Sequence, residues 1–313
     1  MHLERFIQQG VVYSSDLSRE GVDPRVLRAE AARGTLVKIR RGVYADKDQW
    51  MARDSRSRHM ALMSIVQREA SNPVVFAGIS AAAVWGLPLL GEFPDRVTVL
   101  DRWKGGGRSE PGVTRTSRGA TSALAVAVGE FSVTSIARTV LDRARTVPIR
   151  EAIATIDWAL WKRGTSGLAL CDLHAELDLM NPRGGRRSLE IALTESTSLS
   201  DSFGESLARV DMWSLGIPRP TLQREFRDRD GSMFPDFAWE SHGVLGEFDG
   251  RQKYSRNMAV NGDPSEALWR EKKREDRLRA LGFTIVRIFW SDLEHPERLI
   301  AKLMAAGLPR VAR

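Results

Sequence analysis

The alternation of polar and apolar residues is strictest in the last third of the chain, where it predicts two neighbouring strands. One carboxylate alternates with large apolar rings between residues 234 and 239, and two more alternate with apolar side chains between residues 244 and 249. The polar link 240–243 ends in glycine and has the length of a hairpin connection. We therefore expect an antiparallel pair of strands that presents three carboxylates on one face, Asp236, Glu247 and Asp249.

Helix signals surround this pair of strands. Ser202 followed by Glu205 matches a capping box at the start of one helix. Asp263-Pro264 marks the start of a second helix, rich in Arg and Lys, and Gly282 marks its end. The apolar run 283–290 that follows is typical of a mostly buried strand.

The amino-terminal segment, residues 1–50, predicts a winged helix. Helix signals occur three times before Gly34, and the short strands 36–39 and 42–45 follow, joined by two arginines. In such a module the last helix enters the major groove of DNA, and the wing contacts phosphate or the minor groove. The candidate DNA contacts are Arg25, Arg28, Arg33, Lys38, Arg40 and Arg41. Winged helices also serve as protein-interaction modules, so this alternative stays open.

Three carboxylates crowded on one face repel one another, so the predicted site needs a compensating positive charge. A hard divalent cation prefers oxygen ligands, which makes Mg²⁺ or Mn²⁺ the expected cofactor and phosphodiester hydrolysis the expected chemistry. Lys253 or the basic helix would also supply positive charge. Lys273 and Arg274 on that helix are further candidate nucleic-acid contacts.

The order of these elements and four motifs resemble the very-short-patch-repair-like branch of the PD-(D/E)XK nuclease superfamily over residues 185–300. The motifs are Phe234-Pro235-Asp236, Gly246-Glu247-Phe248-Asp249-Gly250, Lys253-Tyr254 and Glu271-Lys272-Lys273-Arg274-Glu275-Asp276. The resemblance implies a restriction-endonuclease-like mixed sheet flanked by helices. It also implies Mg²⁺ ligands at the positions of Glu205, Asp236 and Glu247.

One position departs from the pattern of that superfamily. The superfamily places a water-activating lysine two residues after the glutamate, where this chain has Asp249. The resemblance then implies that Lys253 supplies the cation from a shifted position, and that Asp249 is a further ligand or supports one. The candidate catalytic residues are Glu205, Asp236, Glu247, Asp249 and Lys253.

The amino-terminal part resembles AbiEi-type antitoxins. The resemblance rests on the segment from Leu36 to Tyr44 and continues in Ser80–Pro88 and Thr134–Asp142. It implies a protein that binds its own promoter and restrains a nucleotidyltransferase toxin encoded beside it. In that case the carboxy-terminal fold would be a non-enzymatic clamp on DNA or protein.

Each candidate residue also has an ordinary structural explanation. Glu205 would complete the capping box, Asp236 would be a solvent-facing strand residue, and Asp249 would begin a turn with Gly250. Lys253 and the basic helix would form a solvated surface with intrahelical ion pairs. Taken together with the order of the elements that carry them, these residues favour a nuclease-like site.

Composition limits the class of protein. A net charge of +7 favours an anionic partner, for which duplex DNA is our first expectation and RNA the alternative. The single cysteine, Cys171, excludes an internal disulfide and a cysteine-rich zinc site, and it favours a reducing cytoplasm. No apolar stretch is long enough to cross a bilayer, so we expect no membrane association.

We therefore expect an α/β multidomain protein with three parts. These are a winged helix at 1–50, an α/β middle domain at 51–165 and the PD-(D/E)XK nuclease-like domain at 166–313. The leading hypothesis is a DNA-binding protein with a Mg²⁺-dependent endonuclease domain. The alternative is a non-enzymatic AbiEi-like antitoxin or autorepressor of a toxin–antitoxin or phage-defence system, and a third is an RNA-processing protein.

Overall fold

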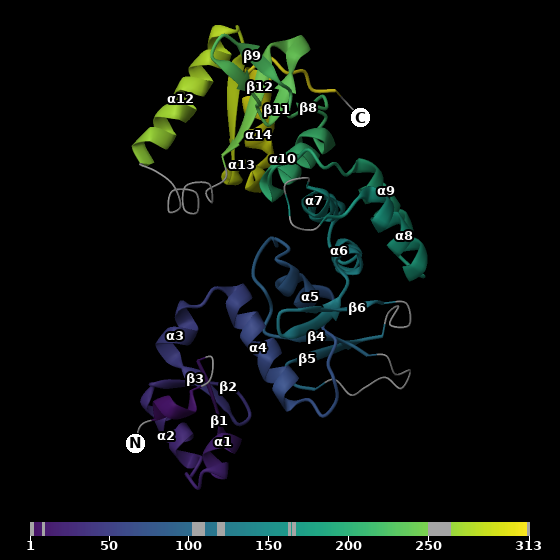
Figure 1. Cartoon of the computed structure of the whole chain (residues 1–313). Coiled ribbons are helices and arrows are strands. Elements are labelled where there is room, and N and C mark those ends of the chain that lie inside the picture. The colour runs from purple at the N-terminus through teal and green to yellow at the C-terminus, as the bar shows by residue number, and fades with distance from the viewer. Residues whose placement is uncertain are drawn as a thin grey trace. The chain divides into compact units, whose positions relative to one another are not determined.

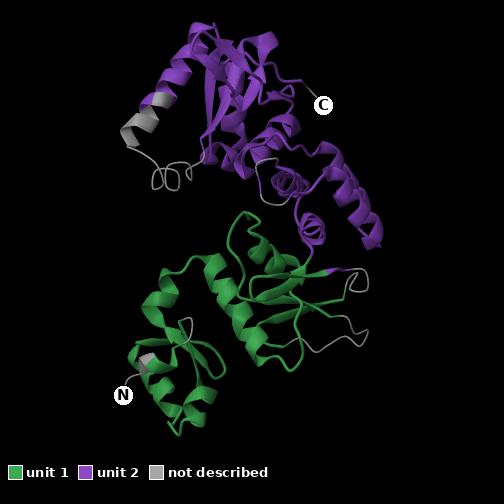
Figure 2. Cartoon of the chain, in the orientation of Figure 1, with its two compact units in different colours: residues 1–121, 125–134 green, residues 122–124, 135–313 purple. Residues whose placement is uncertain are grey.

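The computed structural model describes residues 3–7, 10–101, 110–117, 123–161, 164, 167–249 and 264–311, without the side chains of residues 3, 4, 264–268 and 270. Within these residues the chain forms two compact units, each built of helices and strands (Figure 2). Unit 1 comprises residues 1–121 and 125–134, and unit 2 comprises residues 122–124 and 135–313. The expected mixed α/β class is confirmed, and each unit is described by itself.

Unit 1 begins with a small antiparallel sheet between short helices (Figure 1). Its elements are η1 (Leu3–Phe6), β1 (Val11–Tyr13), α1 (Ser14–Arg19), α2 (Arg25–Arg33), β2 (Leu36–Arg40), β3 (Val43–Asp46) and α3 (Lys47–Ala52). The strand order is β1-β3-β2, and Leu17 and Leu27 bury the helices against this sheet beside Tyr44. The helix, helix and hairpin that the sequence predicted are present. Strand β1 was not predicted, because three residues are too few to show a period.

The helix α4 (Ser55–Glu69) joins this small sheet to the remainder of unit 1. Its Ile65 is fully buried with Val11, Tyr13 and Val43 of the sheet. Its Arg68 binds Asp16 of α1 at 2.6 Å and stacks on the Tyr13 ring. The expected boundary after residue 50 therefore does not separate two compact bodies.

The remainder of unit 1 packs α4 and α5 (Gly78–Trp85) against two strand pairs. The pairs are β4 (Val97–Leu100) with β5 (Val113–Thr116), parallel, and β6 (Ala125–Val128) with β7 (Phe131–Thr134), antiparallel. Phe76 bridges Val99 of one pair and Val133 of the other. Its buried ring contacts Phe131 edge-on, so this residue connects the two pairs and anchors their core.

Unit 2 begins with a group of packed helices. They are α6 (Ile136–Ala144), α7 (Ile149–Leu160), α8 (Leu170–Met180), α9 (Arg186–Glu195) and α10 (Phe203–Ser214). The fully buried Asp157 of α7 receives hydrogen bonds from Arg209 of α10 and from the Thr197 backbone. Helices α6 and α7 thus belong with α8–α10, whereas the sequence had placed residues 51–165 in one middle domain with the strands. The apolar stripe of α7 shows that it is buried but does not show which neighbour covers it.

The second half of unit 2 contains a four-stranded mixed sheet with helices on both faces, and a separate two-stranded antiparallel hairpin (Figure 1). Its elements are β8 (Thr221–Leu222), β9 (Phe226–Asp228), β10 (Gly231–Met233), β11 (Phe237–Trp239), η2 (Glu240–His242), β12 (Val244–Asp249), α12 (Pro264–Ala280), β13 (Thr284–Phe289), α13 (Trp290–Glu294) and α14 (Pro296–Ala305). The strand order is β13-β12-β11-β8, in which β12 and β13 run parallel and the other neighbours antiparallel. The predicted antiparallel pair β11–β12, the helix α12 and the strand β13 are confirmed.

The two faces of this sheet have different partners. Leu245 of β12 packs against Leu278 of α12 on one face. Phe248 of β12 points to the other face, where its ring lies against Gly204 at the start of α10. A Cβ added at Gly204 would collide with this ring, so glycine allows α10 to approach the strand closely.

Helix ends follow the sequence signals closely. Gly34 and Gly282, which end α2 and α12, have positive φ angles of 84° and 92°. None of the helices in the described part of the chain combines the length and the apolar character needed to cross a membrane.

A first prediction concerns the contact between α10 and β12. Gly204→Ala should lower the free energy of unfolding by about 1–3 kcal/mol, because the added methyl overpacks the Phe248 ring. Gly184→Ala is the matched control, since nothing lies within 4 Å of its added Cβ. Denaturant unfolding of both variants measures the difference. Equal stability of the two variants would show that α10 and Phe248 are not in close contact.

Candidate functional site

The two strands β11 and β12 bring Asp236 and Glu247 together. Their antiparallel register pairs Phe237 with Gly246, so Asp236 and Glu247 stand opposite each other one step further along. The Asp236 carboxylate is buried and accepts the backbone N–H of Phe248 at 2.8 Å. The predicted common face for Asp236 and Glu247 is therefore present, and it is the face covered by α12.

Glu247 has a strongly perturbed protonation equilibrium. Burial raises the pKa of Glu247 to about 7, and the negative charge of Asp236 acts in the same direction, although the hydrogen bond from Arg274 opposes it. This carboxyl group therefore binds a proton more readily than an ordinary glutamate does. Perturbed carboxyl groups of this kind cluster at functional sites.

The positive charge expected beside these carboxylates is supplied by arginines of α12 and β13. Arg274 donates from Nη1 to Glu247 Oε1 at 2.8 Å and holds Glu271 through Nε and Nη2. Burial lowers the pKa of Arg274, but the bonds to Glu247 and Glu271 outweigh burial and raise it. Arg287 of β13 donates to Asp249 at 3.4 Å and to Glu275 at 2.8 Å.

Glu271, Glu275 and Arg287 belong to this site, a role that was not predicted from the sequence. The signal for the helix residues was present, because Glu271, Arg274 and Glu275 lie on the same helical stripe as the inward-facing Leu278. A stripe that contains a core leucine must face the sheet, and so must its charged members.

Glu205 has a different environment from the strand carboxylates. It lies in the first turn of α10 and is 1% exposed, and its two carboxylate oxygens accept the Asp201 backbone N–H and the Ser202 hydroxyl, both at 2.8 Å. Glu205 thus caps the start of α10, but its backbone donor is Asp201 and not Ser202, the donor expected for a capping box. Helix α10 also packs on the Phe248 face of β12, opposite the side chain of Glu247.

The described residues fit a divalent cation in part. Asp236 and Glu247 offer two opposed carboxylates in buried surroundings, which is a suitable donor pair for Mg²⁺ or Mn²⁺. Within the described ranges no three His, Cys, Asp or Glu side chains are grouped closely enough to hold a metal ion. Lys253, the expected cation, lies outside the described residues.

The basic residues predicted to contact DNA converge in unit 1. A surface hollow of about 500 Å³, here called the basic hollow, is lined by Arg25 and Arg28 of α2 and by Lys38 and Arg41 of the hairpin. Their four side chains form no ion pair with any other described side chain. Asp23 also lines the hollow, and its carboxylate accepts the Arg25 backbone N–H at 2.9 Å.

The other predicted contacts are already engaged within the protein. Arg33 pairs with Glu30 at 2.7 Å, and Arg40 pairs with Glu69 at 3.3 Å. Lys273 of α12 lies over the ring of Trp269, which is 64% exposed. Of the six DNA contacts predicted within residues 1–50, four line the basic hollow and have no ion-pair partner among the described side chains. The other two, Arg33 and Arg40, are paired with glutamates.

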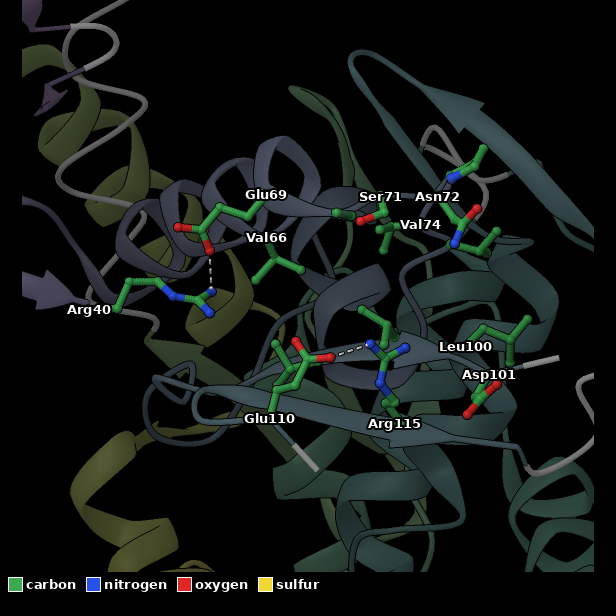
Figure 3. A pocket seen from close by; sticks show the side chains of 15 residues that line it. Arg40, Val66, Glu69, Ser71, Asn72, Val74, Leu100, Asp101, Glu110 and Arg115 are labelled. Atoms are coloured by element: carbon green, nitrogen blue, oxygen red, sulfur yellow. Dashed lines mark hydrogen bonds and ion pairs between the residues drawn. The ribbon is translucent and has the colours of Figure 1, made fainter. Parts of the chain in front are cut away.

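A second hollow of unit 1, about 400 Å³ in volume, shows the opposite charge arrangement (Figure 3). Arg40 points toward Glu69 and Arg115 toward Glu110, so four of its charged side chains form two ion pairs. Its apolar lining comes mainly from valines, including Val66 and Val74. It therefore differs from the basic hollow, where the described cations are uncompensated.

No protein-family model matches the chain. Two curated relatives, "Uncharacterized protein MT2308" and "Uncharacterized protein Rv2248" of two Mycobacterium tuberculosis strains, are each 27% identical over 283 residues, covering 88% of this chain and 94% of the relative. The crystal structure of the RV2827C protein from Mycobacterium tuberculosis is similar with 21% identity and a TM-score of 0.27, covering 66% of this chain and 72% of that one.

The raised pKa of Glu247 makes a prediction about stability. Between its ordinary pKa of 4.5 and its folded value of about 7, the folded protein holds a proton that the unfolded chain has lost. The contribution of Glu247 to the free energy of unfolding is therefore greatest below pH 4.5, its ordinary pKa. This contribution is lost as the pH rises through about 7, the pKa in the folded protein. Glu247→Gln stays neutral, so its stability relative to wild type should rise by about 1–3 kcal/mol between about pH 5 and about pH 8.

Denaturant unfolding at both pH values measures this difference. Glu294→Gln on α13 is the control, because it removes a carboxylate that is exposed and has no ion-pair partner among the described side chains. The same change in stability at both pH values for Glu247→Gln would mean that Glu247 is ionised throughout.

Proposed function

We propose that the protein binds duplex DNA through the basic hollow of unit 1. The observation that carries this proposal is the convergence of four side chains without an acidic partner among the described residues, Arg25, Arg28, Lys38 and Arg41, on one hollow. Unpaired cations at one surface are the electrostatic footprint of a polyanion partner. The origin of these residues in a helix and the adjoining hairpin agrees with a winged helix, in which the helix reads a groove and the wing contacts phosphate.

The pairing pattern makes the DNA proposal testable with matched variants. Removing one cation that neutralises a phosphate should reduce the slope of log affinity against log salt by about 0.9. The double variant Arg28→Gln and Arg41→Gln should therefore bind a duplex more weakly and reduce the slope by about 1.8. Fluorescence anisotropy at a series of salt concentrations measures both quantities.

Arg33→Gln is the control for this experiment. Arg33 lies on the same helix and is exposed, but its charge is already matched by Glu30. It should change the slope much less than the double variant. A salt slope that is the same in wild type and in the double variant would remove the hollow from the DNA interface.

A second function, hydrolysis of phosphodiester bonds with a divalent cation, is favoured by the carboxylate site of unit 2. What supports it is the opposed pair of the buried Asp236 and the largely buried Glu247, which repel each other, together with the pKa of Glu247, which is raised to about 7. Bound between such carboxylates, Mg²⁺ or Mn²⁺ would polarise a phosphoryl oxygen and lower the pKa of water. This proposal separates an endonuclease from an AbiEi-like repressor, because both would bind DNA and only the endonuclease would cleave it.

The residues of the site have separate tasks under this proposal. Asp236 and Glu247 hold the cation, and the Phe248 backbone N–H fixes the orientation of Asp236. Asp249 pairs with Arg287, which holds its carboxylate on the same face of β12 as Glu247. Glu205 accepts two hydrogen bonds in the first turn of α10, so its role under this proposal is to anchor the start of that helix.

The metal proposal predicts stabilisation by the cation and loss of cleavage on mutation. Mn²⁺ should raise the melting temperature by mass action on the folded state, and Asp236→Asn should reduce this rise. Glu247→Gln should reduce metal-dependent cleavage of duplex, single-stranded or mismatched oligonucleotides to background. Its DNA affinity should be retained, because the basic hollow lies in unit 1.

Two measurements check these outcomes, thermal melting with a series of Mn²⁺ concentrations and a gel assay of cleavage. A melting temperature independent of Mn²⁺, together with no cleavage of any substrate by the wild type, would leave DNA binding as the only function. Cleavage that persists in Glu247→Gln would place the active site elsewhere.

A further inference from the structure

The guanidinium of Arg274 has a divided arrangement of hydrogen bonds. Its Nε and Nη2 form a two-point contact with Glu271 of the same helix, at 3.1 and 2.5 Å. Its Nη1 alone reaches across to Glu247 Oε1 on β12, at 2.8 Å. One edge of the planar group is thus fixed to α12, while the remaining nitrogen neutralises the strand carboxylate.

This contact places Arg274 in competition with a cation for the same carboxylate. A guanidinium and a divalent cation compete for the single negative charge of Glu247, and the two positive groups repel each other at close range. A cation that binds Asp236 and Glu247 therefore weakens or breaks the bond from Nη1. The two bonds to Glu271 do not involve Glu247, so they keep the guanidinium beside the site after the exchange.

We propose that Arg274 is a phosphate-positioning residue that Glu247 holds until a divalent cation replaces it. When the cation takes Glu247, Nη1 becomes a free donor next to the metal. It then donates to a non-bridging oxygen of a nucleic-acid phosphate, as charged guanidinium groups readily do. The inference rests on the proposed cation site, and it adds the residue that couples cation binding to substrate binding.

The neighbouring arginines distinguish this arrangement from an ordinary surface ion pair. Arg277, one turn further along α12, binds Asp228 and the Gly231 carbonyl of the β9–β10 hairpin. Arg287 binds Asp249 and Glu275. Among the described arginines of this helix and strand, Arg274 is the one that contacts a carboxylate of the opposed pair.

The test measures cation binding rather than cleavage. Isothermal titration of the full chain with Mn²⁺ should give at least about tenfold tighter binding in Arg274→Gln than in wild type, because the cation no longer displaces a charged hydrogen bond. Arg277→Gln is the matched control and should bind Mn²⁺ as wild type does. Asp236→Asn should abolish the heat, which identifies the site that is titrated.

A second measurement tests the phosphate contact. With Ca²⁺ in place of Mg²⁺ to limit cleavage, wild type should bind a duplex oligonucleotide more tightly on addition of the cation. Arg274→Gln should lose that gain although its cation affinity is higher. Glu271→Gln, which loosens the anchor of the guanidinium and leaves Arg274 in place, should also reduce the gain.

The outcomes separate the two proposals. Unchanged or weaker Mn²⁺ binding in Arg274→Gln would overturn the exchange at Glu247, and a full gain in oligonucleotide affinity in that variant would overturn the phosphate contact. Absence of specific Mn²⁺ binding in both wild type and Arg274→Gln would instead overturn the cation site itself. Tighter Mn²⁺ binding together with loss of the gain supports the assignment.

Discussion

Pairing between arginine and carboxylate is the interaction on which much of unit 2 depends. Arg138 of α6 is 1% exposed and reaches Asp142 at 2.9 Å and Glu176 of α8 at 3.7 Å. Arg209 forms an ion pair with the buried Asp157 at 2.9 Å. Burial raises the pKa of Asp157, although the charge of Arg209 lowers it. A buried charge without its partner costs far more than the pair contributes, so these contacts fix which helices can be neighbours.

The same constraint explains where charge is left over. The chain carries 47 basic and 40 acidic side chains, and in the described part of unit 2 most arginines of the sheet and α12 are matched by carboxylates. The basic hollow of unit 1, whose cations have no acidic partner among the described residues, therefore differs from a largely compensated background. In unit 2 Arg274 is shared between Glu247 and Glu271, and the carboxylate of Asp236 raises the pKa of Glu247.

Much of the fold near these sites could be predicted from local sequence. Period-2 alternation was enough to place Glu247 and Asp249 on one face, and the capping signals gave both ends of α12. The partner of Glu247 could not be predicted, because it depends on how α12 is rotated above the sheet, and Leu278 sets this rotation by packing among side chains from several strands. The environment of Glu205 depends likewise on the close approach of Gly204 to Phe248, which joins residues far apart in the chain.

The position of α4 has a consequence for recognition. Its Ile65 closes the core of the three-stranded sheet, while its Met63 belongs to the core around Phe76. The basic hollow is therefore carried by a sheet that shares a helix with a larger body, and its cations sit on a preorganised surface. Because the backbone of this surface is already ordered, a partner that docks there loses little binding free energy to ordering it. A small number of charges can therefore give a higher affinity than on a flexible segment.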